Sequence, residues 1–395
     1  MFPDLPESLA DLRPLPHCDG PKMEPFDFRG PQKIEFLEYL GEGLHSHVVK
    51  VRILGQVYAL KLFRFCYDGD WLGPALHYMD DDHDLNLEEM TAFGNYSEPF
   101  SAECRAFGRL KEAGHEELAV QCFGYVLLDD EHERALQAQF SDLKLEFTGD
   151  MDSSDAELRS RYVGKGGKLP PIRGLVKEFG RGEEDLRARN ASRILRNIVQ
   201  LQQLGIIHID VGHRQIISGK IADFSTAITS PHYMLNPELN PHLNPKHISA
   251  MEYEAFKFSM MDYWDFDLMI HEWNEEPKNR KKQVSVYAYP RGNGCKIKYN
   301  LRSTPNRERV YSFADPRQYD WQHCGPAGQK SRIPGRVSKM RQKRLDVKPS
   351  RWYYNGSSTK AARLRLAVGG TSLEWYYKDG NIFPRAKSYC GYLDI

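Results

Sequence analysis

Residues 205–225 read GIIHIDVGHRQIISGKIADFS, and this stretch decides the fold that the chain is expected to adopt. Asp210 follows a short apolar run, and Asp223 follows a second strand-like run at 220–222. Asp223 comes eight positions after Gln215, so the chain between them is predicted to turn back as a tight hairpin. The hairpin would hold two carboxylates and an amide near one another, where they could accept a proton and bind a metal ion.

The same stretch is similar to the catalytic segment of protein kinases, whose pattern is H-R-D-x-x-x-x-N. In that pattern the aspartate accepts the proton of the substrate hydroxyl, and the asparagine holds a magnesium ion. By this resemblance Asp210 is a catalytic residue, together with Lys61 and Glu103 upstream, and Asp223, in Asp-Phe-Ser, is a magnesium ligand. Gln215 stands at the asparagine position as a metal ligand on a longer arm. Gly212 stands where a kinase usually carries lysine, which removes a positive charge from the transition state.

Upstream, a glycine-containing hairpin is predicted to cover the phosphates of a nucleotide. Residues 41–48 read GEGLHSHV and lie between two strand-like runs. Glycine and serine leave room for the backbone to approach a phosphate closely. A strand on each side fits the kinase loop, whereas a dinucleotide-binding fingerprint opens a helix; an ordinary glycine turn is the alternative. The predicted nucleotide-binding residues are Gly41, Gly43, Ser46, Val48, Lys61 and, near the end of the strand-like run 172–179, Glu178.

Lys61 is predicted to pair with the nucleotide's phosphates and with a carboxylate, as the strand lysine of a kinase does. It lies in the apolar run 58–63, and burying an ammonium group without a partner costs on the order of several kcal/mol. Glu103, beside the apolar stripe of an expected helix, is the predicted partner, with Glu88 and Glu89 as alternatives. A lysine on the solvent face of a half-buried strand is the other interpretation.

The order of these pieces predicts an α+β, protein-kinase-like fold with two lobes. Strand-like runs at 34–37, 48–51, 57–63, 119–128 and 172–179 predict antiparallel pairing, and helices are expected from Ser101, over 185–204 and over about 249–273. Because little chain remains between Asp223 and the basic part of the sequence, the carboxyl-terminal lobe is expected to be reduced.

The chain is divided into four parts. They are an extended leader over residues 1–30, a kinase-like domain over 31–277 with an acidic insertion at 66–98, a basic turn-rich segment over 278–351, and a carboxyl-terminal segment over 352–395 without an assigned role. The insertion is expected to be irregular. Its acidic cluster at 80–84 lacks the glycine and terminal glutamate of a calcium loop, so a solvated loop is expected there.

The net charge of zero hides a strong polarity along the chain. Residues 278–351 carry 20 Lys and Arg against 4 acidic residues, a net charge of +16, and the first 277 residues carry −19. The two regions are expected to meet different partners, or the basic face packs against the acidic part of the same molecule. The seven cysteines form no CxxC pair, and no apolar run is long enough for a membrane span, so a reducing, intracellular location without membrane contact is expected.

Four stretches resemble a fungal protein family. They read FLEYLGEG at 36–43, YALKLFRF at 58–65, AECRAFGRL at 102–110 and DPRQYDW at 315–321. They are similar to the family named for the kinetochore Sim-four complex subunit Fta-two, many members of which look like degenerate protein kinases. The resemblance covers most of residues 20–325, and it implies a nuclear, centromere-associated binding protein.

Three functions are compared. The leading hypothesis is a pseudokinase in the nucleus that binds inner-kinetochore subunits and retains at most weak binding of ATP and Mg²⁺. The first alternative is an active ATP-dependent phosphotransferase, which Lys61, Asp210 and Asp223 favour. The second is a nucleic-acid-binding protein that contacts DNA through Lys278 to Arg351, chiefly through the basic clusters at 278–282 and 339–344.

Overall fold

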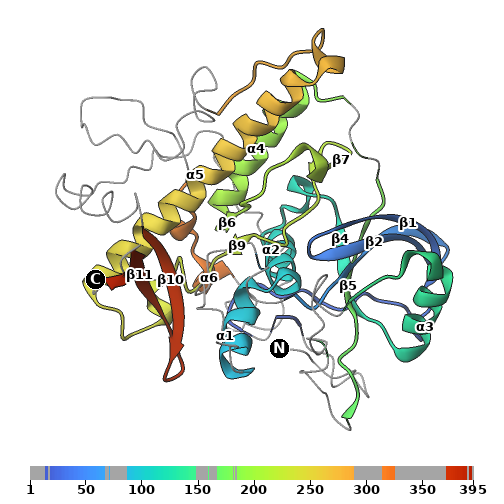
Figure 1. Ribbon diagram of the computed structural model, residues 1–395, viewed down its shortest axis with the longest axis horizontal. Helices are drawn as coiled ribbons and strands as arrows, with labels where there is room; N and C mark the ends of the chain where they lie inside the picture. Colours follow the sequence, from blue (N-terminus) through green and yellow to red (C-terminus); the bar gives the residue numbers. More distant parts are fainter. Residues whose placement is uncertain are drawn as a thin grey trace, which may run out of the picture.

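The computed structural model describes residues 14–16, 18–66, 71, 87–147, 159, 167–180, 182, 185–288, 314–324, 371–388 and 391–393. Within these residues, an antiparallel sheet lies on one side of the molecule and a group of helices on the other, with α2 between them (Figure 1). The α+β class predicted from the sequence is therefore confirmed. Most of the acidic insertion and most of the basic segment lie outside the described residues.

The sheet has five strands in the order β1-β2-β3-β5-β4, and every neighbouring pair is antiparallel. Its strands are β1 (Glu35–Gly43), β2 (Ser46–Ile53), β3 (Gln56–Phe63), β4 (Cys122–Leu127) and β5 (Arg173–Glu178). In β2 the buried residues Val49, Val51 and Ile53 alternate with more exposed ones, as a strand with one buried face requires. Leu54 and Gly55 then turn the chain with positive φ angles of 52° and 80°, which suits the twist of a hairpin. The strands predicted from the sequence are confirmed.

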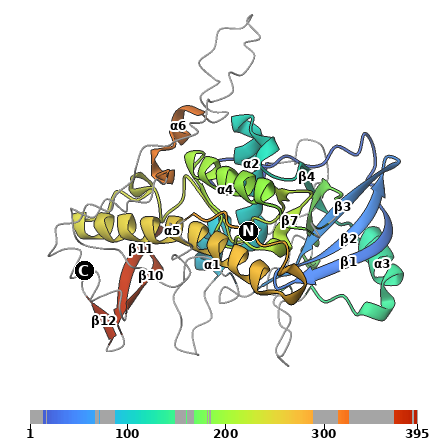
Figure 2. The ribbon, with the colours of Figure 1, turned by 90° about the horizontal axis from the view of Figure 1, so that it is seen from above.

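Six helices are described: α1 (Leu87–Ser97), α2 (Pro99–Ala113), α3 (Asp130–Gln139), α4 (Ala188–Gln203), α5 (Pro245–Glu275) and α6 (Trp321–Cys324). The Glu98 side chain caps α2 at the Ser101 amide, and Asn244 caps α5 at the amides of Lys246 and His247. Helices α4 and α5 lie side by side, as the view from above makes plain (Figure 2). The helices expected from Ser101, at 185–204 and at 249–273 are confirmed as α2, α4 and α5.

The prediction that residues 66–98 form an irregular insertion is wrong for its last part, and the acidic cluster at 80–84, predicted to be a solvated loop, lies outside the described residues. Residues Leu87–Ser97 form helix α1, which begins with Glu88 and Glu89 in its first turn, where carboxylates favour the helix dipole. Buried Met90 and Phe93 lie on one face of α1, three positions apart. The acidic composition therefore hid a helix whose apolar face packs into the molecule.

Short strand pairs connect the sheet to the helices. Strand β6 (Ile206–Ile207) pairs with β9 (Ile228–Thr229), and β7 (Ile216–Ile217) pairs with β8 (Lys220–Ile221). The second pair is the tight hairpin that the spacing between Gln215 and Asp223 predicts.

The chain before β1 packs against the body of the molecule. Leu15 and Met23 exchange two backbone hydrogen bonds of 3.0 and 2.8 Å, and both side chains are buried. Further on, the Phe26 amide donates to the Tyr125 carbonyl in β4 at 2.8 Å. A Cβ atom on Gly124 would lie 2.6 Å from the Phe26 nitrogen, so only glycine fits at this crossing. The predicted leader therefore contributes to the core from Leu15 onward.

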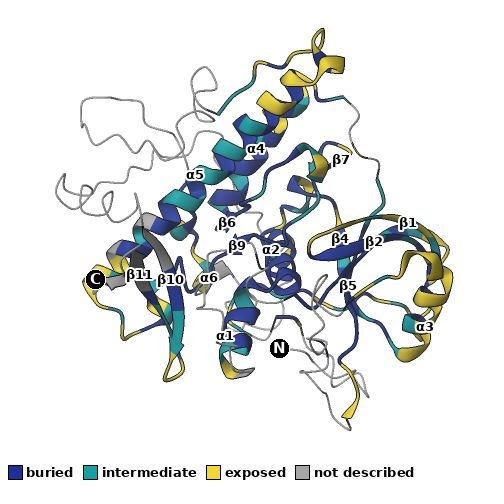
Figure 3. Ribbon diagram, viewed as in Figure 1, coloured by how far each residue is buried: buried dark blue, intermediate teal, exposed yellow. Residues whose placement is uncertain are grey.

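The buried residues form three clusters that join these elements (Figure 3). The largest lies between α2, α4, α5 and the inner face of the sheet. The second lies on the other face of the sheet, against α3. The third joins α1, the first half of α5 and the strand that holds Trp375. The functional residues described below lie where the first cluster meets the sheet.

The end of the chain forms a separate three-stranded sheet that docks onto the helices. Its strands are β10 (Thr371–Lys378), β11 (Asn381–Ser388) and β12 (Gly391–Leu393). The Trp375 side chain is 1% exposed and packs edge-on against Tyr233, with ring centroids 5.0 Å apart. Tyr377 donates a 2.5 Å hydrogen bond to Glu88 in α1. The segment at 352–395, to which the sequence assigned no role, thus includes part of the core.

Candidate functional site

Lys61, Glu103 and Asp223 form one ion-pair group at the junction of the sheet and the helices. In β3, Leu60 and Leu62 enter the core on one face of the sheet, so Lys61 points from the other face toward α2. Its Nζ donates to Glu103 Oε2 at 2.8 Å and to Asp223 Oδ1 at 2.7 Å. Lys61 is 4% exposed and Glu103 is fully buried. The structure thus brings together the lysine, the helix carboxylate and the second aspartate as the sequence predicts.

The two alternative partners of Lys61 do not reach it. Glu88 accepts the hydrogen bond from Tyr377, and Glu89 lies next to Glu88 in the first turn of α1. Glu103 is therefore the helix carboxylate that pairs with Lys61.

A second lysine, which sequence reasoning missed, completes the group. Lys177 in β5 donates to Glu103 Oε1, and also to the Ala222 carbonyl at 2.9 Å. Its side chain is almost as buried as that of Lys61. The signal that could have found it is the same as for Lys61, because Lys177 also interrupts an apolar strand-like run. Lys61, Lys177, Glu103 and Asp223 are called the four-charge cluster below.

The lysines of the four-charge cluster control the ionisation of Asp223. Burial alone would raise the pKa of Asp223, but the positive charges of Lys61 and Lys177 and the Lys61 hydrogen bond hold this pKa far below its ordinary value. For Lys61, burial would lower the pKa, and the carboxylates of Asp223 and Glu103 together raise it above its ordinary value. The charged forms of both residues are therefore favoured in the folded protein.

This shift predicts a loss of stability in acid. Because the pKa of Asp223 is lower in the folded than in the unfolded protein, its contribution to stability is present above the unfolded value of 3.8 and is lost as the pH falls below it. We expect urea-unfolding midpoints to fall more steeply between pH 5 and pH 2, roughly, in the wild type than in Asp223→Asn. Parallel pH profiles for the two proteins would contradict the assignment.

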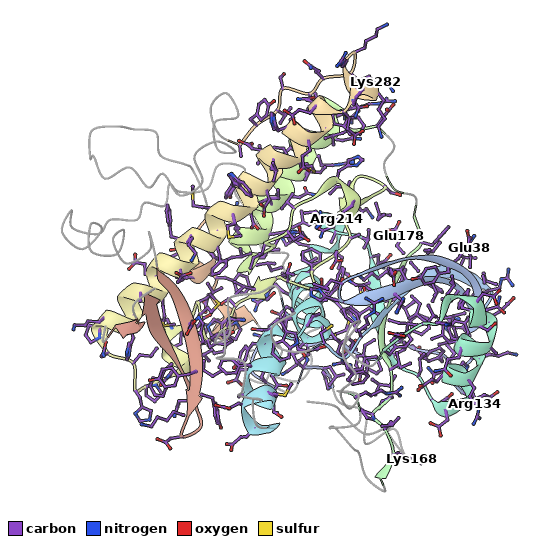
Figure 4. All side chains as sticks on the ribbon, in the orientation of Figure 1. Glu38, Arg134, Lys168, Glu178, Arg214 and Lys282 are labelled. Atoms are coloured by element: carbon purple, nitrogen blue, oxygen red, sulfur yellow. The ribbon has the colours of Figure 1, made fainter. Side chains whose placement is uncertain are left out.

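Asp210 is held by its own loop. A 3₁₀ turn at His213–Gln215 follows it, and Arg214 donates to Asp210 Oδ1 at 2.7 Å and to Oδ2 at 2.6 Å. Gln215 Nε2 donates to the same Oδ2 at 2.6 Å. The Arg214 side chain is 70% exposed, so this ion pair lies at the surface (Figure 4). The carboxylate predicted to accept a proton from a substrate is thus already the acceptor of three hydrogen bonds.

A buried carboxylate on α5 anchors the loop that carries Asp210. Asp262 accepts hydrogen bonds from the amides of His208 at 3.1 Å and Ile209 at 2.7 Å, and from Gln202 at 3.0 Å. It is fully buried, and burial raises its pKa despite these donors. Ile209 has a positive φ of 69°, which is strained for a β-branched residue and is held in place by this contact.

Sequence reasoning missed Asp262 as well. It lies four positions before Phe266 and eight before Ile270 on the same buried face of α5. A carboxylate on the apolar stripe of a helix, where solvent cannot reach it, is the signal that could have revealed it.

Three rings that pack edge to face connect this anchor to α2. His208 packs against Phe224 with ring centroids 5.1 Å apart, and Phe224 packs against Phe107 in α2 at the same distance. His208 Nε2 also donates to the Asp223 carbonyl at 2.5 Å. The Asp-Phe-Ser turn is thus fixed from both sides, and Asp223 is presented to Lys61.

The β1–β2 hairpin closes over this turn. Its tip residue His45 lies 3.2 Å (Nδ1 to Oγ) from Ser225, and Arg64 donates to Glu42 Oε2 at 2.5 Å and to the Gly43 carbonyl at 2.9 Å. Among the residues predicted to bind nucleotide, Ser46 is buried next to the hairpin tip. Val48 is half-buried, and Cβ atoms on Gly41 and Gly43 would meet nothing within 4 Å.

Glu178, the remaining predicted nucleotide-binding residue, lies at the end of β5 near the β7–β8 hairpin (Figure 4). Its Oε2 accepts from Lys220 in β8 at 3.0 Å and from the Gln121 amide at 3.3 Å. The Lys220 hydrogen bond lowers the pKa of Glu178. Its side chain thus links the sheet to the β7–β8 hairpin.

The residues predicted to hold Mg²⁺ already form hydrogen bonds within the protein. The hydrogen bonds that the described residues give the Asp223 carboxylate go to Oδ1, from Lys61 and from the Ser225 amide at 2.9 Å. Gln215 Oε1 is buried and accepts no hydrogen bond from the described residues, but its amide group is turned so that Nε2 meets Asp210. The described residues contain no group of three or more His, Cys, Asp or Glu side chains arranged for a metal ion.

Two lysines at the start of the basic segment form ion pairs within the chain. Lys282 lies at the far end of α5 from β10 and donates to Asp185 at 2.8 Å, and Lys278 pairs with Glu276 at 2.8 Å (Figure 4). The second predicted cluster, at 339–344, lies outside the described residues. In the part of the chain that the structure describes, no helix has the length and apolar character that crossing a membrane requires.

Comparison with known families gives one match. The model of the family described as "Kinetochore Sim4 complex subunit FTA2" matches residues 12–228, more than half of the chain. The matched part contains the four-charge cluster and Asp210 but ends before α5 and before the run at 315–321. Comparison with curated proteins finds no match. The chain belongs to the family of the kinetochore Sim4 complex subunit FTA2.

Proposed function

We propose that this chain is a kinetochore subunit in the nucleus that works by binding protein partners, on a two-lobed, protein-kinase-like fold with a reduced carboxyl-terminal lobe. The family match supports the kinetochore role and partners within a complex. The sheet, α2, the Asp210 loop and the Asp223 turn follow one another in the order of a kinase nucleotide site, which supports the fold.

The observation that carries the pseudokinase part of the proposal is the state of Asp210. A catalytic base must be free to accept the proton of a substrate hydroxyl. Here Arg214 and Gln215 both donate to the Asp210 carboxylate, and Arg214 neutralises its charge. A kinase usually carries a lysine at the position of Gly212, so this loop has no cation there to stabilise the transition state, and the positive charge of Arg214 is already engaged by Asp210.

Weak binding of ATP is part of this proposal. Lys61 is the residue that would hold the α- and β-phosphates, and the open glycine positions of the β1–β2 hairpin would cover them. Because Lys61 already pairs with Glu103 and Asp223, phosphate has to compete with two carboxylates. ATP bound there would contribute the negative charge of its phosphates. It would stabilise the folded protein, and its γ-phosphate would not be transferred.

The alternative is an active phosphotransferase, and one observation favours it. The pairing of Lys61 with Glu103 and its closeness to Asp223 are the arrangement that an active kinase needs. Any turnover would then require the Arg214 pair to open so that Asp210 becomes accessible.

Two measurements on the full chain separate these functions. The purified protein is expected to release phosphate or label a general protein substrate at a rate far below the 1–100 per second, roughly, of typical kinases. In cells, a fluorescently tagged Asp210→Asn variant is expected to gather at centromeres as strongly as the tagged wild type.

Robust transfer that Asp210→Asn abolishes would establish the phosphotransferase instead. Absence of the wild-type protein from centromeres would contradict the kinetochore role. Arg214→Ala serves as the matched variant, because it removes the charge that neutralises the Asp210 carboxylate and keeps the carboxylate itself.

A further inference from the structure

The charges of the four-charge cluster balance without a metal ion. Two lysines face two carboxylates, so the net charge of the cluster is zero, whereas Lys61, Glu103 and Asp223 alone would carry −1. We propose that Lys177 is a built-in cation that takes the place of the divalent metal ion, so that this site accepts the phosphates of a nucleotide free of Mg²⁺. That the site binds a nucleotide rests on the proposed function. That Lys177 takes the place of a divalent ion does not depend on it.

The position of Lys177 carries this inference. In the β3–β5 register Lys177 faces Ala59, two residues from Lys61, so both lysines point to the same side of the sheet. Its Nζ contacts Glu103 on one side and the Ala222 carbonyl, directly before Asp223, on the other. The ammonium group therefore lies between the helix carboxylate and the turn that holds Asp223.

A divalent ion at Asp223 would meet this fixed positive charge. The lysine is buried and cannot turn away into water, and repulsion between like charges is strong in such surroundings. Gln215, the other residue predicted to bind the metal, is also engaged, because it donates to Asp210. Arg214 neutralises the charge of Asp210. A polyphosphate without a metal ion, by contrast, is repelled less, because with Lys177 the net charge of the cluster is zero and not −1.

Removal of the lysine charge should create a metal site, and this gain is the test. Lys177→Met keeps an unbranched side chain of similar length and leaves the cluster with a net charge of −1. We expect Mn²⁺ alone to raise the melting temperature of Lys177→Met, with an apparent affinity at least about tenfold higher than for the wild type. The matched control is Glu103→Gln/Lys177→Met, in which the charge is again zero and no response to Mn²⁺ is expected.

ATP forms the second arm of the same experiment. The wild type is expected to be stabilised by ATP at least as strongly with EDTA as with Mg²⁺, and Lys177→Met only with Mg²⁺. If ATP stabilises the wild type under neither condition, the proposed nucleotide binding fails while the Mn²⁺ arm still decides the role of Lys177.

Three results would overturn the inference. They are saturable stabilisation of the wild type by Mn²⁺, a folded Lys177→Met that does not respond to Mn²⁺, and ATP stabilisation of the wild type that EDTA removes. Should Lys177→Met fail to give a cooperative melt, Lys177→Gln replaces it. If that variant also fails to fold, the wild-type titrations with Mn²⁺ and with ATP decide.

Discussion

Replacing Glu103 with alanine is expected to lower the free energy of unfolding by about 3–5 kcal/mol. Glu103 is fully buried and pairs with Lys61 through one oxygen and with Lys177 through the other. Without it, two buried ammonium groups lose a partner at once, and only Asp223 remains to compensate Lys61. Urea unfolding followed by circular dichroism at neutral pH measures the change.

A surface ion pair of the same helix provides the control. Lys111 in α2 pairs with Glu24, and their side chains are 46% and 66% exposed. Glu24→Ala is expected to change the free energy of unfolding by about 0–1 kcal/mol, because water screens the exposed pair. Equal effects of Glu103→Ala and Glu24→Ala would show that the four-charge cluster does not hold the sheet to α2.

Replacing Asp262 with alanine is expected to cost about 2–6 kcal/mol, because the buried amides of His208 and Ile209 each lose an acceptor worth about 1–3 kcal/mol. The strained backbone of Ile209 loses its support as well. We expect faster hydrogen exchange at these two amides, together with a lower midpoint of thermal unfolding.

Glu275→Ala is the matched control for Asp262→Ala. Glu275 lies on the same helix and pairs with His271, but its side chain is 68% exposed. Its removal is expected to change stability by less than about 1 kcal/mol and to leave exchange at His208 and Ile209 unchanged. Protected amides in a folded Asp262→Ala protein would show that another group holds the loop.

Local patterns in the sequence predict much of the fold. Strand β2 is predictable because buried and exposed residues alternate along it, and helix α2 is predictable because its apolar residues fall on one face. Both patterns involve residues that are close together in the sequence. Helix α1 was missed because its acidic first turn follows a stretch of acidic sequence. Its apolar face is recognised only from its packing against Tyr233.

Residues of the candidate site are predictable from the sequence only where they belong to a short motif. Lys61, Glu103 and Asp223 stand in a known order, and the structure brings them together. Lys177 and Asp262 belong to no motif used here, and their roles depend on contacts with residues 74 and 54 positions away in the chain. Burial of a charge on a strand or helix is a property of the folded molecule, and local sequence reports it only as an unexpected polar residue in an apolar run.

The anchoring of the Asp210 loop by α5 has a practical consequence for work with fragments of this protein. The region by which the family is recognised ends at residue 228, whereas the acceptor for the His208 and Ile209 amides lies 34 residues beyond that boundary, at Asp262. A fragment cut at the family boundary would contain every residue of the four-charge cluster and yet lack the helix against which α4 packs. The unit that is recognised by sequence is thus smaller than the unit that folds, and a fragment for binding assays should extend at least through Glu275.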